Sequence, residues 1–231
     1  MKRITTLVLL LTLFSSCEVM SQLPRTGGGF TEAEAGQGIK EALAQGLGRA
    51  VSTLNRTDGF FGSQLYKLLL PPDAQRVERT MRQLGLGPQV DRAILQINRG
   101  AEDAVGYAAP IFTDAIRQMT LQDAIGIVRG PNNAATTYFK EKTTARLMEA
   151  FRPVVQNSLD KVEATRYYSD LITAYNRFPT TRNKINPDLT SYVVEKAVEA
   201  LFDQIAQEEA EIRANPLKRT SDILQKVFGG R

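Results

Sequence analysis

Residues 189–214 read LTSYVVEKAVEALFDQIAQEEAEIRA, and this stretch decides the fold. Its apolar side chains recur every three to four residues, which places them along one side of a helix. The inward positions are Val193, Ala197, Leu201, Ile205 and Ile212. The positions expected to face water are Glu199, Asp203, Gln207 and Glu211. The pattern predicts a long helix that is buried on one face and ends before Asn215-Pro216.

A second helix of this kind begins at Thr31. Thr31 and Glu34 have the spacing of a capping box, in which each side chain binds a free amide of the first turn. The apolar face of this helix consists of Ile39, Leu43, Leu47 and Val51. It also carries Gly36, Gly38, Gly46 and Gly48, each of which costs about 1 kcal/mol of helix propensity relative to alanine. The glycines indicate that a neighbouring helix or a ligand approaches the backbone closely, and helix packing is the favoured explanation.

Helical patterns also fill most of the chain between these two ends. They cover residues 73–84, 88–105, 111–119, 120–129, 133–159 and 164–178, and a last one starts at 221. Pro153 is expected to kink or divide its helix, and residues 66–70 are expected to lie extended over the core. We find no convincing period-2 alternation. The sequence therefore predicts an all-α fold, a single bundle-like domain of roughly eight to ten helices over residues 31–231.

The first 17 residues, MKRITTLVLLLTLFSSC, have the order of a secretory signal. Two basic residues precede an apolar run that is shorter than the about 20 residues of a membrane-spanning helix. Two serines and then Cys17 follow it. We expect residues 1–16 to be a signal peptide and Cys17 to be a lipid attachment site, from which acyl chains enter the membrane. The alternative is a plain signal peptide with an incidental cysteine.

Residues 17–30 are expected to form a flexible tether, because they contain Pro24 and three consecutive glycines and lack an apolar period. A lipidated chain of this kind would be exported and would face the periplasm from the bacterial cell envelope. The 29 basic and 25 acidic residues are interspersed, whereas a nucleic-acid partner calls for a concentrated basic stripe. No nucleic-acid partner is expected.

The chain contains no histidine, and Cys17 is its single cysteine. This composition excludes Ser-His-Asp triads, histidine nucleophiles, disulfides within the chain and zinc sites of the ordinary type. Neither a metal nor a cofactor is predicted. Catalysis would depend on Asp, Glu, Lys, Tyr or Ser alone.

Four residues are candidates for contact with a ligand or a partner: Arg166, Tyr168, Tyr175 and Asp188. Tyr168 and Tyr175 share a helix face, and the favoured interpretation is that both lie at the edge of the core with bonded hydroxyl groups. A ligand pocket is the alternative. Asp188 precedes the long helix of residues 189–214, so capping that helix is favoured over binding a cation.

Two further stretches allow a functional interpretation and a structural one. Residues 130–133, Gly-Pro-Asn-Asn, precede a helix whose N-terminus is able to hold a phosphate, although an ordinary helix junction is favoured. Glu208, Glu209 and Glu211 offer carboxylates for a cation or for acid–base chemistry, although a solvated acidic stretch is favoured.

Several short motifs together resemble one protein family. They are Thr31 to Glu34, Asp58-Gly59-Phe60, Gln118 to Thr120, Asp123-Ala124, Ala134 to Thr136, Tyr138-Phe139, Ala164 to Tyr168, Asn186 to Thr190 and Ile223 to Gly229. With these motifs the chain is similar to domain of unknown function 4197, a family of uncharacterised bacterial lipoproteins. The resemblance implies an all-helical, exported domain and no established activity. Tyr168 departs from the family pattern, in which tryptophan is expected.

These observations favour a membrane-anchored lipoprotein with a non-catalytic helical domain that binds a protein partner or a lipid-like ligand. One alternative is an envelope enzyme that works without histidine. The other is a structural component of the envelope without a small ligand. A buried apolar cavity would favour the lipid-like ligand, and a filled core with exposed apolar side chains would favour a protein partner.

Overall fold

The computed structural model describes residues 31–161, 163–177 and 184–215 of the 231-residue chain. Within these residues it contains helices and no strand, which confirms the all-α class. The elements are α1 (Glu32–Leu54), the 3-10 turn η1 (Pro72–Ala74), α2 (Gln75–Gln83), α3 (Gly87–Val105), α4 (Ala108–Gln118), α5 (Leu121–Arg129), α6 (Ala134–Asp160), α7 (Ala164–Arg177) and α8 (Leu189–Ala214). These eight α-helices are at the lower end of the predicted number. The predicted signal peptide, tether and helix from residue 221 lie outside the described residues.

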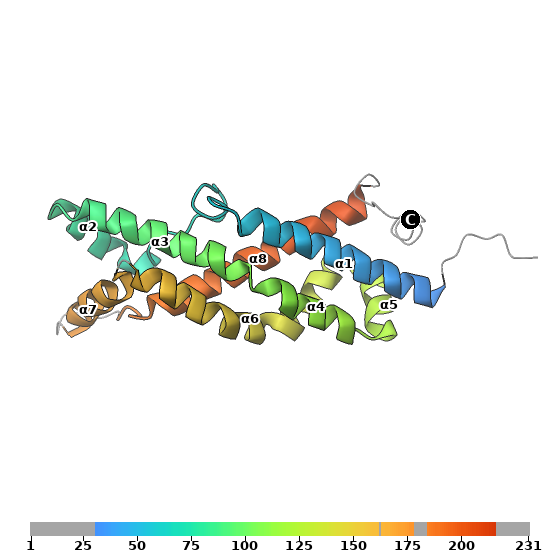
Figure 1. Cartoon of the computed structure of the whole chain (residues 1–231). Coiled ribbons are helices and arrows are strands. Elements are labelled where there is room, and N and C mark those ends of the chain that lie inside the picture. Colours follow the sequence, from blue (N-terminus) through green and yellow to red (C-terminus); the bar gives the residue numbers. More distant parts are fainter. Residues whose placement is uncertain (1–30, 162, 178–183, 216–231) are drawn as a thin grey trace, which may run out of the picture.

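The helix α8 is the central element of an elongated bundle (Figure 1). It packs against α1, α3, α6 and α7, and its predicted inward residues are all buried. The four residues predicted to face water are exposed. The apolar period of residues 189–214 therefore fixes both the length of this helix and the face around which the others assemble.

Aromatic side chains join two of the helices, α4 and α6, to α8. The ring of Phe112 on α4 lies 5.5 Å from Phe139 on α6 and 6.1 Å from Phe202 on α8, both in edge-to-face geometry. All three rings are buried. Such pairs contribute about 0.5–1.5 kcal/mol each beyond the area that they bury. They fix α4 and α6 against the middle of α8.

Local signals in the sequence set several helix ends. The Thr31–Glu34 capping box is present, and Thr120 with Asp123 forms a second one at the start of α5. Asp188 caps α8 by accepting a 2.8 Å hydrogen bond from the Ser191 amide. The capping interpretation of Asp188 is therefore confirmed.

The glycines of α1 are explained only in part by helix packing. A Cβ at Gly36 would lie 3.1 Å from a Leu121 methyl group of α5, and one at Gly46 would lie 3.5 Å from Glu208 Cβ of α8. Gly48 instead faces open space. Two of the glycines thus allow close packing, and Gly48 lies on the exposed side of the helix.

The helix α6 continues through Pro153, so the prediction that this proline could divide it was wrong. Pro153 is exposed, where water can solvate the carbonyl group that loses its intrahelical donor. None of the helices in the described part of the chain is long and apolar enough to cross a membrane.

Candidate functional site

The structure does not gather the four predicted contact residues into one pocket. Tyr168 is buried and donates a hydrogen bond of 3.4 Å to the Asn186 carbonyl, and burial raises its pKa to about 12. Tyr175 is half-buried against the core. Arg166 is exposed, and its nearest carboxylate is Asp170 at 4.0 Å. Tyr168 and Tyr175 therefore have the core-edge role that was favoured from the sequence.

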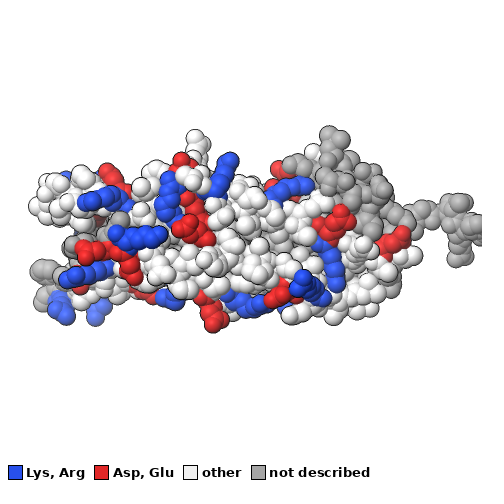
Figure 2. Space-filling model, in the orientation of Figure 1, with Lys and Arg blue, Asp and Glu red and all other residues white. Residues whose placement is uncertain are grey.

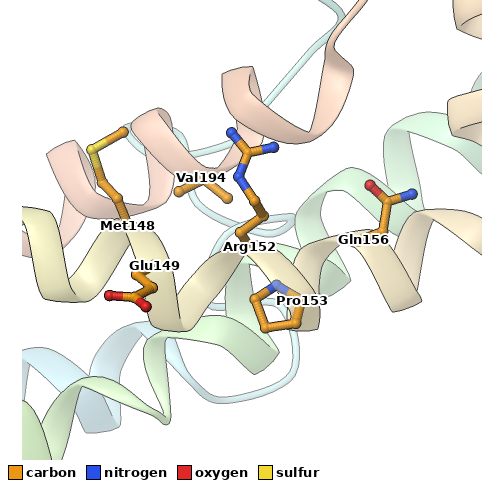
Figure 3. Close-up of a pocket in the computed structure, with 6 residues that line it drawn as sticks. All are labelled: Met148, Glu149, Arg152, Pro153, Gln156 and Val194. Carbon is orange, nitrogen blue, oxygen red and sulfur yellow. The ribbon is translucent and has the colours of Figure 1, made fainter.

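Asp188 lies beside the largest hollow that we describe, an open groove of about 480 Å³ between α6 and α8 (Figure 3). The groove is lined by Met148, Glu149, Arg152, Pro153, Gln156 and Val194. Arg152 extends from α6 and donates to Asp188 and Ser191, at the start of α8. Burial by itself would raise the pKa of Asp188, but hydrogen bonds from Ser191 and the charge of Arg152 hold it below its usual range.

Two of the polar side chains that line this groove, Arg152 and Gln156, are bonded to neighbouring residues. Thr190 donates a 2.7 Å hydrogen bond to Gln156, and Gln156 donates to Asp160. Together with the contact of Arg152 to Asp188, these bonds fasten α6 to the first turn of α8. The groove thus uses its polar groups for packing, which makes it a weak candidate for a ligand site.

A different surface combines exposed apolar side chains with a firmly held backbone. Residues 63–70, which we call the crossing segment, run from the loop after α1 to η1 and pass behind α3 in Figure 1. Their side chains alternate in exposure: Leu68 and Leu70 are buried, whereas Leu65 is 67% exposed and Leu69 is 50% exposed. Lys67, between the two exposed leucines, is exposed as well. The predicted extended course of residues 66–70 agrees with this alternation at residues 67–69, whereas Tyr66 is the last residue of a turn and Leu70 lies in a bend.

The side chain of Asn98 on α3 holds the middle of the crossing segment. Its carboxamide accepts a 2.8 Å hydrogen bond from the Leu68 amide and donates one of 2.8 Å to the Leu68 carbonyl. It donates a third, of 2.7 Å, to the Ile94 carbonyl of its own helix. Asn98 is fully buried, so all of these bonds are shielded from water. The amide side chain replaces the neighbouring strand that an extended chain would otherwise need.

Glu102, one helical turn further along α3, holds the loop that precedes the crossing segment. One carboxylate oxygen accepts hydrogen bonds of 3.1 Å from the amides of Phe60 and Phe61. The other binds Arg99 at 2.6 Å, and Arg99 also binds Asp58 at 2.8 Å. Glu102 is buried, and its carboxylate is therefore fully engaged in fixing this loop.

The backbone of this loop explains the Asp58-Gly59-Phe60 motif. Asp58 has a left-handed conformation, with φ of 65°, which aspartate tolerates better than most residues. A Cβ at Gly59 would lie 2.3 Å from the Leu54 carbonyl oxygen, so only glycine fits there. Phe60 is fully buried in the core. The motif thus turns the chain out of α1 and into the crossing segment.

Tyr66 fastens the crossing segment to α8. Its hydroxyl donates a 2.8 Å hydrogen bond to Asp203 and accepts one of 2.9 Å from Gln207. Burial and the Asp203 carboxylate raise the pKa of Tyr66 to about 12. The crossing segment is therefore held to α3 through Asn98 and to α8 through Tyr66, while Leu65 and Leu69 remain exposed.

Two of the three glutamates near the end of α8 are buried, so the interpretation of a solvated acidic stretch was wrong for Glu208 and Glu209. Glu209 accepts hydrogen bonds from the amides of Ala135 and Thr136 at the start of α6, and a third from the Thr136 hydroxyl. It also binds Arg213, at 2.9 Å. The free amides that made residues 130–133 a candidate phosphate site are thus bound by a carboxylate of the chain itself.

The buried carboxylates do not converge on an open site. Glu102, Glu208 and Glu209 each bind an arginine, and they lie at separate helix contacts. Among the described residues, no group of three acidic side chains is placed to hold a metal ion. On the face shown in Figure 2, basic and acidic side chains are interspersed. The crossing segment is therefore the surface that best fits a functional role.

Comparison with known proteins gives one match. The family described as protein of unknown function (DUF4197) matches residues 29–229, most of the chain. No curated protein matches the chain, and no solved structure does.

Proposed function

We propose that the chain, which belongs to the DUF4197 family, is a membrane-anchored lipoprotein of the cell envelope whose helical domain binds a protein partner. The observation that carries this proposal is the crossing segment, where Leu65 and Leu69 are exposed on a chain held to α3 by its backbone and to α8 by the Tyr66 side chain. Ordering a flexible surface on binding costs conformational entropy, and a surface that is already fixed avoids this cost. Exposed apolar groups on a fixed backbone therefore favour docking.

The interior favours a protein partner over a lipid-like ligand. A second hollow, more enclosed than the groove between α6 and α8, lies among α1, α5, α6 and α8 and has a volume of about 30 Å³. This volume is enough for about one water molecule. An acyl chain needs far more room, since small-molecule pockets have volumes of about 300–1,000 Å³. The filled interior and the exposed leucines are the combination expected for a domain that binds a protein.

The membrane anchor in this proposal rests on the N-terminal sequence. Basic residues, an apolar run and two serines lead directly to Cys17, the single cysteine of the chain. Each buried CH₂ group of an attached acyl chain would contribute about 0.8 kcal/mol to membrane binding, so several chains would anchor the protein stably. The glycines and proline of residues 18–30 would then let the domain stand off the membrane.

Replacing Cys17 with serine is expected to release the protein from the membrane fraction. Serine offers no thiol for the acyl chains, while the helical domain is left unchanged. The measurement is the partition between pellet and supernatant after a carbonate wash, with mass spectrometry of the N-terminus. Ser21→Ala, in the tether, is the matched control and should remain in the pellet. A C17S protein that stays in the washed pellet, or an unmodified Cys17 in the wild type, would contradict the anchor.

A photo-reactive residue at position 65 is expected to form a covalent adduct of one discrete protein mass in intact cells. Leu65 lies on the proposed docking surface, so its partner is within reach of the probe. The same probe at Leu121, an exposed leucine on α5, is the control. The readout is the adduct pattern on a denaturing gel and its mass. Identical adducts at both positions, or adducts with lipid alone, would contradict a protein partner at this surface.

A further inference from the structure

We propose that the crossing segment binds its partner by strand addition: an extended segment of the partner pairs, antiparallel, with the free backbone edge of Lys67 and Leu69. This inference rests on the proposed function and names the form in which the partner is recognised. It assigns to an all-helical domain a binding mode that is otherwise typical of sheet edges.

The first step is the conformation of Leu68. Its amide and its carbonyl both bind the Asn98 carboxamide, at 2.8 Å each. The two groups of one residue point to the same side only when the backbone is extended, as in a hydrogen-bonded pair of a sheet. Leu68 is buried between the exposed Lys67 and Leu69, which is the alternation of an extended chain. Residues 67–69 thus have an extended, strand-like backbone, and Asn98 occupies one of its edges.

The second step concerns the opposite edge. In an extended chain, neighbouring residues direct their backbone groups to opposite sides, so Lys67 and Leu69 face away from Asn98. In the part of the chain that the structure describes, the amides and carbonyls of these two residues have no hydrogen-bond partner. Both residues are exposed. Backbone groups without a partner in the protein are found where water can reach them, because buried ones are nearly always paired. This edge is therefore solvated and free to pair with a second strand.

The side chains define the chemistry of the partner. Lys67 and Leu69 project from the same face of the extended residues 67–69, and Leu65, in the turn just before them, is exposed as well. Lys67 makes no ion pair with any described residue, and its ammonium lies 4.2 Å from the centre of the Phe61 ring. Apolar pairs and pairs of opposite charge stabilise directly opposed positions. The partner segment therefore carries apolar, acidic and apolar side chains at alternate positions.

The test uses the full-length protein and a synthetic peptide, acetyl-STVTETVTS-amide, which presents this alternation in either chain direction. Methylating the amide nitrogen of its central glutamate removes a donor that would pair with Lys67. Methylating the amide nitrogen of the preceding threonine removes a donor on the edge of the peptide that faces away from the protein. Loss of one hydrogen bond worth about 1.4 kcal/mol lowers affinity about tenfold. We expect the peptide methylated at glutamate to lose about tenfold in affinity, and the peptide methylated at threonine to lose less than about threefold.

Amide hydrogen exchange supplies the structural readout. In the free domain the Leu68 amide should exchange slowly and those of Lys67 and Leu69 rapidly, and the peptide should slow the latter two. The Lys67→Glu variant should bind STVTKTVTS, which has lysine in place of the central glutamate, more tightly than STVTETVTS. Lys161→Glu, at an exposed lysine after α6, controls for the change in net charge. Together these results would establish strand addition.

Three results would overturn the inference: no saturable binding of the peptide at millimolar concentration, equal effects of the two methylations, or protection of amides elsewhere. A discrete cross-link from position 65 alongside any of these would leave the proposed function standing and reject strand addition alone. A dimer that protects Lys67 and Leu69 without peptide would also overturn the assignment, because the occupant would then be a second copy of the chain.

Discussion

Replacing Glu102 with alanine is expected to lower the free energy of unfolding by about 3–4 kcal/mol. The substitution leaves the amide of the buried Phe60 without an acceptor and removes the carboxylate that binds Arg99 at 2.6 Å. Each unsatisfied buried donor costs about 1–3 kcal/mol, and breaking a buried ion pair costs about 3–5 kcal/mol. Arg99 is partly exposed and keeps Asp58 as a partner, which limits the loss. The measurement is urea unfolding followed by circular dichroism.

Two variants sharpen this prediction. Asp103→Ala changes the next residue, which is exposed, and should alter stability by less than about 0.5 kcal/mol. Glu102→Gln keeps an acceptor oxygen for the loop amides but loses the charge that binds Arg99, so an intermediate loss is expected. If E102A unfolds within about 1 kcal/mol of the wild type, the carboxylate does not hold the loop in solution. The crossing segment would then lack the rigidity that the proposed function requires.

The features that the sequence alone predicts well are local ones. The bounds of α8 agree with the predicted residues 189–214, because its apolar period and its capping residue lie within the helix or next to it. The capping boxes at Thr31 and Thr120 are recognised for the same reason. The non-helical course of residues 66–70 was also predicted, since the run is short and is followed by two prolines. These signals need no knowledge of the tertiary fold.

The polar residues that hold the candidate site were missed, because their partners are distant in sequence. Asn98 binds Leu68 across 30 residues, and Glu102 binds Phe60 across 42. A signal was nevertheless present. Asn98 and Glu102 follow Ile94 at intervals of four residues, on the apolar face of α3. A polar residue within an apolar stripe indicates a buried group that must bind a partner, although the sequence does not say which one.

The predicted contact residues were selected for a different reason. Tyr168 and Tyr175 were noticed because aromatic and basic residues cluster there, but Tyr168 serves the core and Arg166 points into water. The leucines of the crossing segment drew no such attention, because in the sequence they resemble ordinary core residues. Only the fold shows which of the leucines between residues 65 and 70 face outward.

Replacing Glu209 with alanine is expected to destabilise the domain by about 3–5 kcal/mol, at least as much as the loss of Glu102. Glu209 lies four residues after Ile205 on the buried face of α8. Its carboxylate binds the second and third amides of α6, where Asn133, the residue at the N-cap, makes no side-chain bond. It thereby acts as a cap supplied from another helix and complements the positive end of the helix dipole.

The ion pair with Arg213 makes the loss of Glu209 costly. Both side chains are 8% exposed, so E209A leaves a buried guanidinium that has lost its carboxylate. Arg213 would keep a 3.0 Å bond to the Ile127 carbonyl, which offsets part of the cost. The measurement is the unfolding midpoint in urea, together with amide exchange at Ala135 and Thr136. Those two amides should lose protection before the rest of α6.

Matched variants separate the cap from the ion pair. Glu195→Ala removes an exposed glutamate of the same helix and should leave stability within about 0.5 kcal/mol of the wild type. Thr136→Val removes the hydroxyl that donates to Glu209 but keeps the backbone amide, so about 1 kcal/mol is expected. In the double variant of Glu209→Ala and Thr136→Val, the total loss of stability should be smaller than the sum of the two single losses, because both changes act on one carboxylate. Strict additivity, with unchanged exchange at Ala135, would mean that Glu209 does not cap α6.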